Sequence, residues 1–172
     1  GARVFSDIFP ALAQALARLD KALAGHDDEA ETEARVAAQG MVQASRILTR
    51  KYHLVITNPP YLGVQQYGDQ LKDFCESNYP RAKNELANVF FERSLRLCVP
   101  GGTVEFVMPQ NWLFLPGYKK ARAHLLEHET WLTLAKLGPG AFETITGGVV
   151  KGILISVSRQ APADSHSVYA ID

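Results

Sequence analysis

The feature that most constrains this chain is a short β-branched run that stops at two prolines. Leu54-Val55-Ile56-Thr57 is apolar up to its last residue, and Asn58-Pro59-Pro60-Tyr61 follows it directly. A run of this length predicts a buried strand, and paired prolines end it because they fix φ and cannot donate to a ladder. We therefore expect a strand that leads into a rigid turn at Asn58.

Strand-like and helix-like patterns alternate after this turn. Apolar spacing predicts a loop and then helices at residues 84–98 and 117–127, with Pro100-Gly101-Gly102 ending the first helix. Short β-branched runs predict further strands at residues 103–108, 131–137 and 149–158. This alternation predicts an α/β fold whose sheet is parallel at least in part. Only a loop separates the last two strands, so we expect them to pair antiparallel.

The first 50 residues are expected to form two helices. A first apolar stripe recurs at three- and four-residue steps, at Phe9, Leu12, Leu16, Leu19 and Leu23. After an interruption at residues 25–28, a second helix is expected from Glu29 to Arg50. The patterns therefore predict a helical segment at residues 1–50, an α/β segment at 51–160, and a tail or the start of another element at 161–172.

Composition restricts the classes of partner. The 172 residues have an ordinary balance for a folded domain, and the formal net charge is zero. No apolar run approaches the ~20 residues that span a bilayer, so we expect a cytoplasmic protein with no membrane partner. Proteins that grip a DNA backbone unaided are usually basic, so a nucleic-acid enzyme of this composition needs phosphate contacts from elsewhere. Cys75 and Cys98 are isolated and are expected to be free, buried thiols.

The turn at Asn58 offers a specific chemistry. The prolines remove two backbone donors, so the carbonyls of Asn58 and Pro59 and the side-chain oxygen of Asn58 can accept hydrogen bonds from a ligand. Two acceptors that hold both hydrogens of one –NH₂ group direct its lone pair toward an electrophile. The ring of Tyr61 can stack on a planar base. This arrangement predicts methyl transfer to an amide-like or exocyclic amino nitrogen; the alternative is a plain structural turn.

Two other clusters have competing interpretations. His124 and His128 lie one helical turn apart, a spacing that can bind zinc, but no third ligand is evident, so we predict no metal site. Lys119, Lys120 and Arg122 form a small basic cluster that can either contact phosphate or form a solvated helix face.

Residues 52–159 resemble the adenine-specific DNA methyltransferases of the class I, S-adenosylmethionine-dependent fold. Leu54 to Gly63 is similar to the catalytic motif of that family, and Glu85 to Glu92 is similar to a helix that lines the cofactor pocket. Pro100 to Pro109 is similar to the next strand motif, and Gly138 to Val150 is similar to a late loop that helps to hold the flipped base. Methyltransferases of BREX phage-defence systems and large type II restriction–modification enzymes are the most similar members.

The resemblance implies the C-terminal half of a Rossmann-like methyltransferase sheet, preceded by a helical pair. It implies methyl transfer from S-adenosylmethionine to the amino group of an adenine flipped out of double-stranded DNA, in phage defence or restriction–modification, with other defence proteins as partners. The implied catalytic residues are Asn58, Pro59, Pro60 and Tyr61. The expected DNA contacts are Arg81, Lys83 and Phe142. For Phe142 the alternative is a residue of the core under the late loop. The expected cofactor contact is Asn88.

One departure from the family bears on the cofactor. The Gly-rich loop and the acidic residue that hold it have no counterpart before Tyr52. We therefore expect a fragment that binds S-adenosylmethionine weakly or not at all on its own, and calorimetry that shows micromolar binding would contradict this. Two alternatives stay open: a methyltransferase for protein glutamine side chains, whose amide presents the same –NH₂ group, and a non-catalytic module that binds DNA or a partner.

Overall fold

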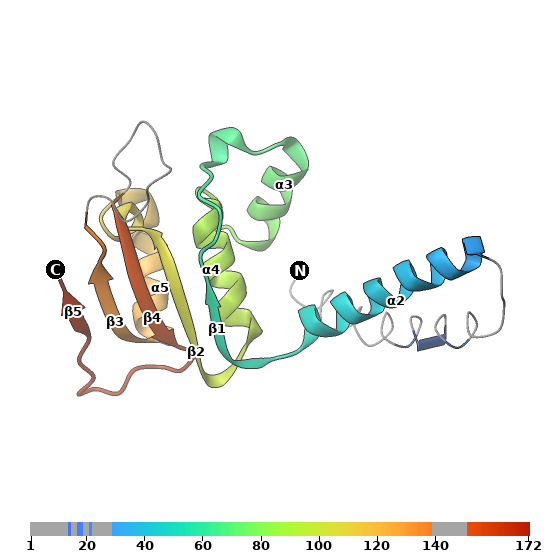
Figure 1. Ribbon diagram of the computed structural model, residues 1–172. Helices are drawn as coiled ribbons and strands as arrows, with labels where there is room; N and C mark the ends of the chain where they lie inside the picture. The colour runs from blue at the N-terminus through green and yellow to red at the C-terminus, as the bar shows by residue number, and fades with distance from the viewer. Residues whose placement is uncertain (1–13, 15–16, 19–20, 22–28, 139–150) are drawn as a thin grey trace. The chain divides into compact units, whose positions relative to one another are not determined.

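The computed structural model describes residues 14, 17–18, 21, 29–138 and 151–172, and the chain divides into two compact units at residue 50. Figure 1 labels the elements. In chain order they are α2 (Glu29–Thr49), β1 (Tyr52–Thr57), η1 (Val64–Gln66), α3 (Asp69–Asn78), α4 (Leu86–Leu97), β2 (Cys98–Pro109), η2 (Asn111–Leu113), η3 (Pro116–Tyr118), α5 (Lys119–His128), β3 (Thr130–Lys136), β4 (Gly152–Ser158) and β5 (Tyr169–Ile171).

In the first unit, helix α2 forms where the second N-terminal helix is expected. Its sequence is rich in alanine and begins with acidic residues, and both features favour a helix at this place. Ala38 and Val42, one turn apart, are buried, whereas Met41 and Leu48 are exposed. Most of the first expected helix lies outside the described residues. None of the described helices is long and apolar enough to cross a membrane.

The second unit is built on a five-stranded sheet with the strand order β1-β2-β4-β3-β5. β1 and β2 are parallel, as are β3 and β5, whereas β4 is antiparallel to both of its neighbours. The predicted α/β class with a partly parallel sheet is confirmed, and so is the antiparallel pairing of β3 with β4. The segment beyond residue 160 supplies β5, which extends the sheet beside β3.

Helices α4 and α5 lie behind the strands in Figure 1 and cover one face of the sheet. Ala87, Phe91 and Leu95 of α4 are four residues apart and form one buried stripe. Strand residues two apart share a face, and alternate residues of β2 and β4 meet this stripe. The large side chains of these two strands that are at most 1% exposed are those of Val104, Phe106, Met108, Ile153, Ile155 and Val157.

The expectation of a buried first strand is wrong in part. β1 pairs only with β2 among the described residues, and Leu54 and Ile56 are 51% and 68% exposed. Val55 pairs with Val104 and packs on the core, so its two neighbours point to the opposite face. The run is apolar on both faces, but within the described second unit the helices cover only one of them.

The Pro-Gly-Gly segment also differs from its expected role. It does not end the preceding helix, because α4 stops at Leu97 and Cys98 already opens β2. Gly101 has a φ of +77°, which glycine adopts without strain. Backbone hydrogen bonds join Gly101 and Gly102 to Arg159. The segment is therefore an irregular start of a strand.

Helix α3 occupies the segment where the sequence pattern predicts a loop. It belongs to a second, smaller apolar cluster formed by Cys75, Tyr79, Ala82 and Val89. This cluster fixes the connection from α3 to α4. Cys75 and Cys98 are buried and free, as expected, and burial raises the pKa of both thiols.

Candidate active site

The segment Asn58–Tyr61 begins where β1 ends. β1 and β2 are parallel, so both strands end at the same edge of the sheet, which we call the carboxyl edge (Figure 1). Asn58 and Pro60 are exposed there, whereas Pro59 is buried and Tyr61 packs in part against the main core. Open α/β sheets bind ligands beyond the carboxyl ends of their strands. The Asn58 carboxamide is therefore presented where a ligand of this fold is expected.

The phenol of Tyr61 ties the turn to the sheet. Its hydroxyl lies 3.1 Å from Oδ1 of Asn58 and 3.1 Å from the backbone oxygen of Val107 in β2. Burial, together with the nearby Glu85 carboxylate, raises the pKa of Tyr61 to about 12, so the hydroxyl remains a donor at neutral pH. A carboxamide oxygen has two lone pairs. Asn58 can therefore accept a hydrogen bond from a ligand –NH₂ group while Tyr61 orients it.

Glu85 holds the other end of the turn. Its Oε1 accepts a hydrogen bond of 2.6 Å from the backbone N–H of Leu62. The N–H of Leu86 donates to the carbonyl of Leu62 at 2.9 Å, and the N–H of Val64 donates to the carbonyl of Asn84 at 3.0 Å. We call residues 62–64 and 84–86 the latch strip. This role of Glu85 is not predicted above from the sequence, although an acidic residue directly before an apolar helix is an available signal.

Arg81 and Lys83, the expected phosphate contacts, are engaged in ion pairs. Nη2 of Arg81 lies 3.5 Å from Oε1 of Glu92, and Nζ of Lys83 lies 3.1 Å from Oε1 of Glu76. The side chains of the two cations are 41% and 38% exposed. Pairs with this exposure contribute about 0–1 kcal/mol, so a phosphate can replace either carboxylate. The DNA role of the two residues stays a prediction.

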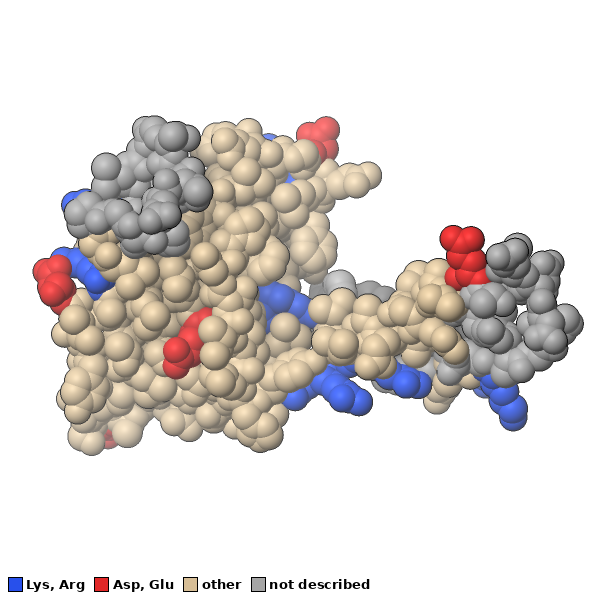
Figure 2. Space-filling view, viewed as in Figure 1, with Lys and Arg blue, Asp and Glu red and all other residues tan. Residues whose placement is uncertain are grey.

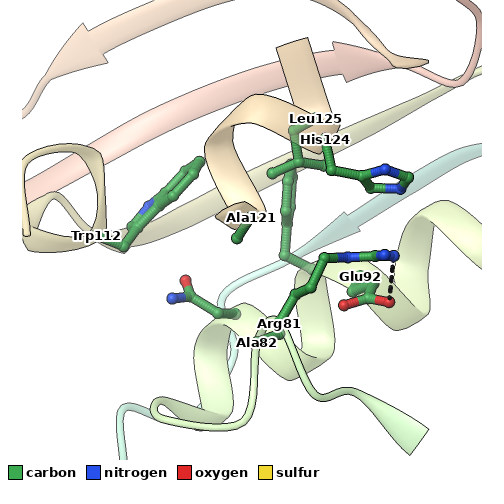
Figure 3. A pocket seen from close by; sticks show the side chains of 9 residues that line it. Arg81, Ala82, Glu92, Trp112, Ala121, His124 and Leu125 are labelled. Carbon is green, nitrogen blue, oxygen red and sulfur yellow. Dashed lines mark hydrogen bonds and ion pairs between the residues drawn. The ribbon is translucent and has the colours of Figure 1, made fainter. Parts of the chain in front are cut away.

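Asn88 lies in a small cavity between α4 and α5. Figure 3 shows the Arg81–Glu92 pair and His124 on one side of this space and Trp112 on the other. The accessible volume is about 30 Å³, which suits about two water molecules. Ligand pockets are roughly ten times larger. S-adenosylmethionine does not fit this cavity.

The wall of this cavity contains buried polar groups. The carboxamide of Asn88 and the indole N–H of Trp112 are both buried and make no hydrogen bond of normal geometry to the described residues. Burial raises the pKa of the nearby Tyr118 phenol, and the Asn88 side chain opposes this rise. The accessible wall of the cavity is almost entirely apolar and the cavity is too small for the cofactor, so the cofactor role of Asn88 stays a prediction.

The basic cluster of α5 divides into two parts in the structure. Nη1 of Arg122 donates to the backbone oxygens of Trp112 and Leu115 at 2.7 and 2.8 Å, so this arginine holds the segment that precedes the helix. Lys119 and Lys120 are exposed at the first turn of α5. The three cations are adjacent in the sequence, and only the fold separates the structural one from the other two.

The remaining candidates are His124, His128 and Phe142. The rings of His124 and His128 lie 4.2 Å apart. In the described ranges, no group of three or more His, Cys, Asp and Glu side chains is arranged to hold a metal ion. Phe142 lies outside the described residues, so its role stays a prediction.

Comparisons with known proteins agree with this geometry. The Eco57I restriction-modification methylase family matches residues 7–142, and the chain belongs to this family. The adenine-specific methyltransferase BrxX of Escherichia coli O9:H4 (strain HS) is 35% identical over 129 residues, which cover 75% of this chain and 11% of that protein. The adenine-specific methyltransferase PglX of Lacticaseibacillus casei (strain Zhang) is 31% identical over 124 residues, which cover 71% and 10%. The expected resemblance is confirmed, and the chain spans about a tenth of the length of these relatives.

Solved structures share the fold. A chain of a type I restriction–modification complex has a TM-score of 0.55 and 27% identity, over 68% of this chain and 23% of that chain. A Listeria monocytogenes protein described as a class I S-adenosylmethionine-dependent methyltransferase has a TM-score of 0.54 and 14% identity, over 84% of this chain and 47% of that chain. The second likeness concerns the fold alone. With the observed sheet, it confirms the class I methyltransferase architecture.

Proposed function

We propose that this chain positions the target amino group in a longer methyltransferase that transfers a methyl group from S-adenosylmethionine to adenine in DNA. One observation carries the proposal: the exposed carboxamide of Asn58 stands at the carboxyl edge, where Tyr61 and the latch strip hold it. Membership of the methylase family and the names of the two curated relatives support the chemistry and the substrate.

In this proposal Asn58 and Pro59 hold the two hydrogens of the amino group. The acceptors are Oδ1 of Asn58 and the backbone oxygen of Pro59, which has no adjacent N–H because residue 60 is also a proline. The amino nitrogen of adenine is a poor nucleophile since its lone pair is delocalised into the ring. Two accepted hydrogen bonds favour the tetrahedral geometry in which that lone pair points outward. When bound, S-adenosylmethionine would supply the methyl group from a sulfonium, with the thioether as the leaving group. The methylated nitrogen would then be acidic and would release one proton to water, so no residue has to act as a strong base.

The remaining site residues bind the substrate. An amino group inside a duplex is not accessible, so the adenine has to be flipped out of the helix. The hydroxyl of Tyr61 is fixed beside Asn58, which sets the position of its ring for stacking on the flipped base. Arg81 and Lys83 exchange their carboxylate partners for phosphates, and Phe142 supplies a second aromatic contact.

The cofactor side of the site is proposed to lie elsewhere in the longer protein. The cavity beside Asn88 has about 30 Å³ of accessible volume, far too little for S-adenosylmethionine. The sequence before Tyr52 has no strand followed by a Gly-rich turn. In this proposal the described residues bind and orient the amine, and another part of the longer protein holds the methyl donor.

The test is methylation by the full-length protein with Asn58 substituted. Wild type, Asn58→Ala and Asn58→Asp are expressed in bacteria that lack adenine methylation, and methyladenine is mapped by sequencing genomic DNA. We expect wild type to mark one recognition sequence and Asn58→Ala to lose about 100-fold or more in rate, as when one donor of an oxyanion hole is removed. Asn58→Asp keeps an acceptor oxygen and retains part of the activity. Asn58 is exposed, so the thermal stability of the variants should match that of wild type.

Two results contradict this proposal. Methylation that survives Asn58→Ala excludes the catalytic role of the turn. Labelled S-adenosylmethionine that marks a protein glutamine and no DNA assigns the same –NH₂ chemistry to a different substrate.

A further inference from the structure

The loop that follows β2 exposes two large apolar side chains. Phe114 is 66% exposed and Leu115 is 46% exposed, whereas Trp112 and Tyr118 on either side of them are buried. We call residues 111–118 the tip loop; it contains η2 and η3. Two aromatic anchors thus fix the ends of the loop, and an apolar tip projects between them.

The exposure of this tip does not come from a loose segment. Arg122 donates to the backbone oxygens of Trp112 and Leu115 at 2.7 and 2.8 Å. The carbonyl of Asn111 accepts the N–H groups of Phe114 and Leu115, each at 3.0 Å. An aromatic ring that stays two-thirds exposed on an ordered backbone gains little burial energy. The folding of the described second unit therefore gives little reason for a phenylalanine at this position.

The tip loop lies next to the candidate active site. It leaves the carboxyl end of β2, at the same edge from which Asn58 leaves β1. The tip loop also approaches the latch strip, because a Cβ placed on Gly117 lies 3.8 Å from Nδ2 of Asn84. The strip in turn carries the residues that follow Tyr61. A substrate held at Asn58 therefore meets the neighbourhood of this loop.

Positive charge accompanies the apolar tip. Lys119 and Lys120 follow the loop and are exposed in the first turn of α5. That first turn contains no acidic residue. Neither lysine forms an ion pair within the part of the chain that the structure describes. The N-terminus of a helix adds a partial positive charge. An apolar tip followed by two exposed lysines complements duplex DNA, where phosphates border stacked bases.

We propose that Phe114 inserts into the DNA duplex beside the target adenine and occupies the stacking position that the flipped base leaves, while Lys119 and Lys120 bind flanking phosphates. Aromatic and apolar wedges that separate base steps are an established way to open a duplex. Phe114 is then a positioning residue, since it acts on the duplex and does not touch the reacting nitrogen. This inference rests on the proposed DNA adenine methyltransferase function.

The first experiment compares two DNA substrates for the full-length protein. One is a duplex with the recognition sequence found by methylation mapping, and the other places the target adenine opposite an abasic site, which lowers the cost of unpairing. We expect Phe114→Ala to reduce methylation of the normal duplex by about tenfold or more and to come within about twofold of wild type on the abasic duplex. Leu126→Ala is the matched control, since Leu126 is a 53% exposed apolar residue of α5, and we expect it to act like wild type on both.

The outcomes separate the two proposals. Asn58→Ala should be defective on both duplexes, because an unpaired adenine still needs its amino group held. No methylation of DNA by wild type overturns both proposals. If wild type methylates DNA, two results overturn the role of Phe114 alone. One is full activity of Phe114→Ala on the normal duplex, and the other is an equal loss of its activity on both duplexes. Thermal unfolding of Phe114→Ala at the wild-type temperature excludes a folding defect.

The second experiment tests the lysines through the salt dependence of DNA binding. Each phosphate contact contributes about 0.9 to the slope of log Kd against log salt. Replacing Lys119 and Lys120 together by alanine should weaken binding and reduce that slope by about two. Replacing both by arginine keeps the charge and should keep the slope. An unchanged slope in the alanine variant contradicts the phosphate contacts.

Discussion

The two faces of the sheet differ in residues and in surroundings, and each carries an isoleucine in a strand. On the face covered by α4 and α5, Ile155 of β4 and Val104 of β2 are completely buried. On the opposite face, Ile56 of β1 is 68% exposed, and Oγ of Ser156 donates to Oε1 of Glu105 at 3.1 Å. Figure 2 views the second face and shows few charged side chains over the strands. The two faces therefore differ in cover and in polarity, since Glu105 and its partner Ser156 share the face of Ile56.

This difference separates two contributions of an apolar side chain: its burial, which stabilises the second unit, and its β-propensity, which favours a strand. Apolar side chains contribute to folding in proportion to the area they remove from water. Ile155 removes all of its side chain from water, whereas Ile56 leaves most of its own in contact with solvent. Both residues suit a pleated backbone equally well, because isoleucine is β-branched. Substitutions at these two positions compare the faces with the side chain held constant.

The largest effect is expected from Ile155→Ala on the covered face. The truncation leaves a cavity in the middle strand of the core, and such changes cost about 2–5 kcal/mol. Urea unfolding of the 172-residue chain, followed by circular dichroism, measures the free energy of unfolding. A loss below about 1 kcal/mol would mean that the core re-packs around the change, and would remove the contrast between the faces.

A smaller effect is expected where the covered core meets the carboxyl edge, at Tyr61. Tyr61→Phe keeps the partly buried ring against the core and removes the hydroxyl that reaches Asn58 and Val107. One hydrogen bond is worth about 1 kcal/mol, so we expect a stability loss of that order. The methylation rate of the full-length protein should be lower than that of wild type but still measurable, because the Asn58 and Pro59 acceptors remain. Wild-type stability combined with wild-type activity would show that the tether has no role.

A still smaller effect is expected at Glu129, which follows α5. Burial raises the pKa of this carboxyl above its ordinary value of 4.5, against the opposing charges of Arg159 and His128. A raised folded pKa contributes stability that is complete below the unfolded pKa and is lost as pH rises through the folded pKa. The stability of Glu129→Gln relative to wild type should therefore rise from pH 4 to pH 7, by less than about 1 kcal/mol. Urea unfolding at both pH values measures this, and a stability difference that stays constant or falls between them contradicts it.

The sequence predicts the elements well and their surroundings less well. The strands at β2, β3 and β4 and the helices at α4 and α5 lie where the apolar patterns indicate, because short β-branched runs and apolar residues at helical spacing distinguish them. The exposure of Leu54 and Ile56 is not predictable in this way. A continuous apolar run is the pattern of a strand covered on both faces, and which face is covered depends on elements that the run does not encode.

The candidate site divides in the same manner. The Asn58–Tyr61 turn is evident from the sequence since its residue types carry the chemistry. The Glu85 latch and the Arg122 clamp depend on contacts between residues 7 to 23 positions apart. Phe114 is one apolar residue among several in its segment, and nothing in the pattern distinguishes an exposed tip from a core position. Solvent exposure on an ordered loop is information that only the fold supplies.

The smallest effect is expected from Ile56→Ala, the counterpart of Ile155→Ala on the open face. The side chain is 68% exposed, so its truncation leaves no cavity and removes little buried area. Surface substitutions of this kind stay within about 0.5 kcal/mol, and the loss of β-branching adds only part of that. The urea unfolding used for Ile155→Ala also measures this loss. Because both positions lose the same isoleucine side chain, the difference between the two free-energy losses is due to the burial of Ile155 under the helices. A loss at Ile56 equal to that at Ile155 would show that the open face is packed in solution, and the comparison between the faces would then fail.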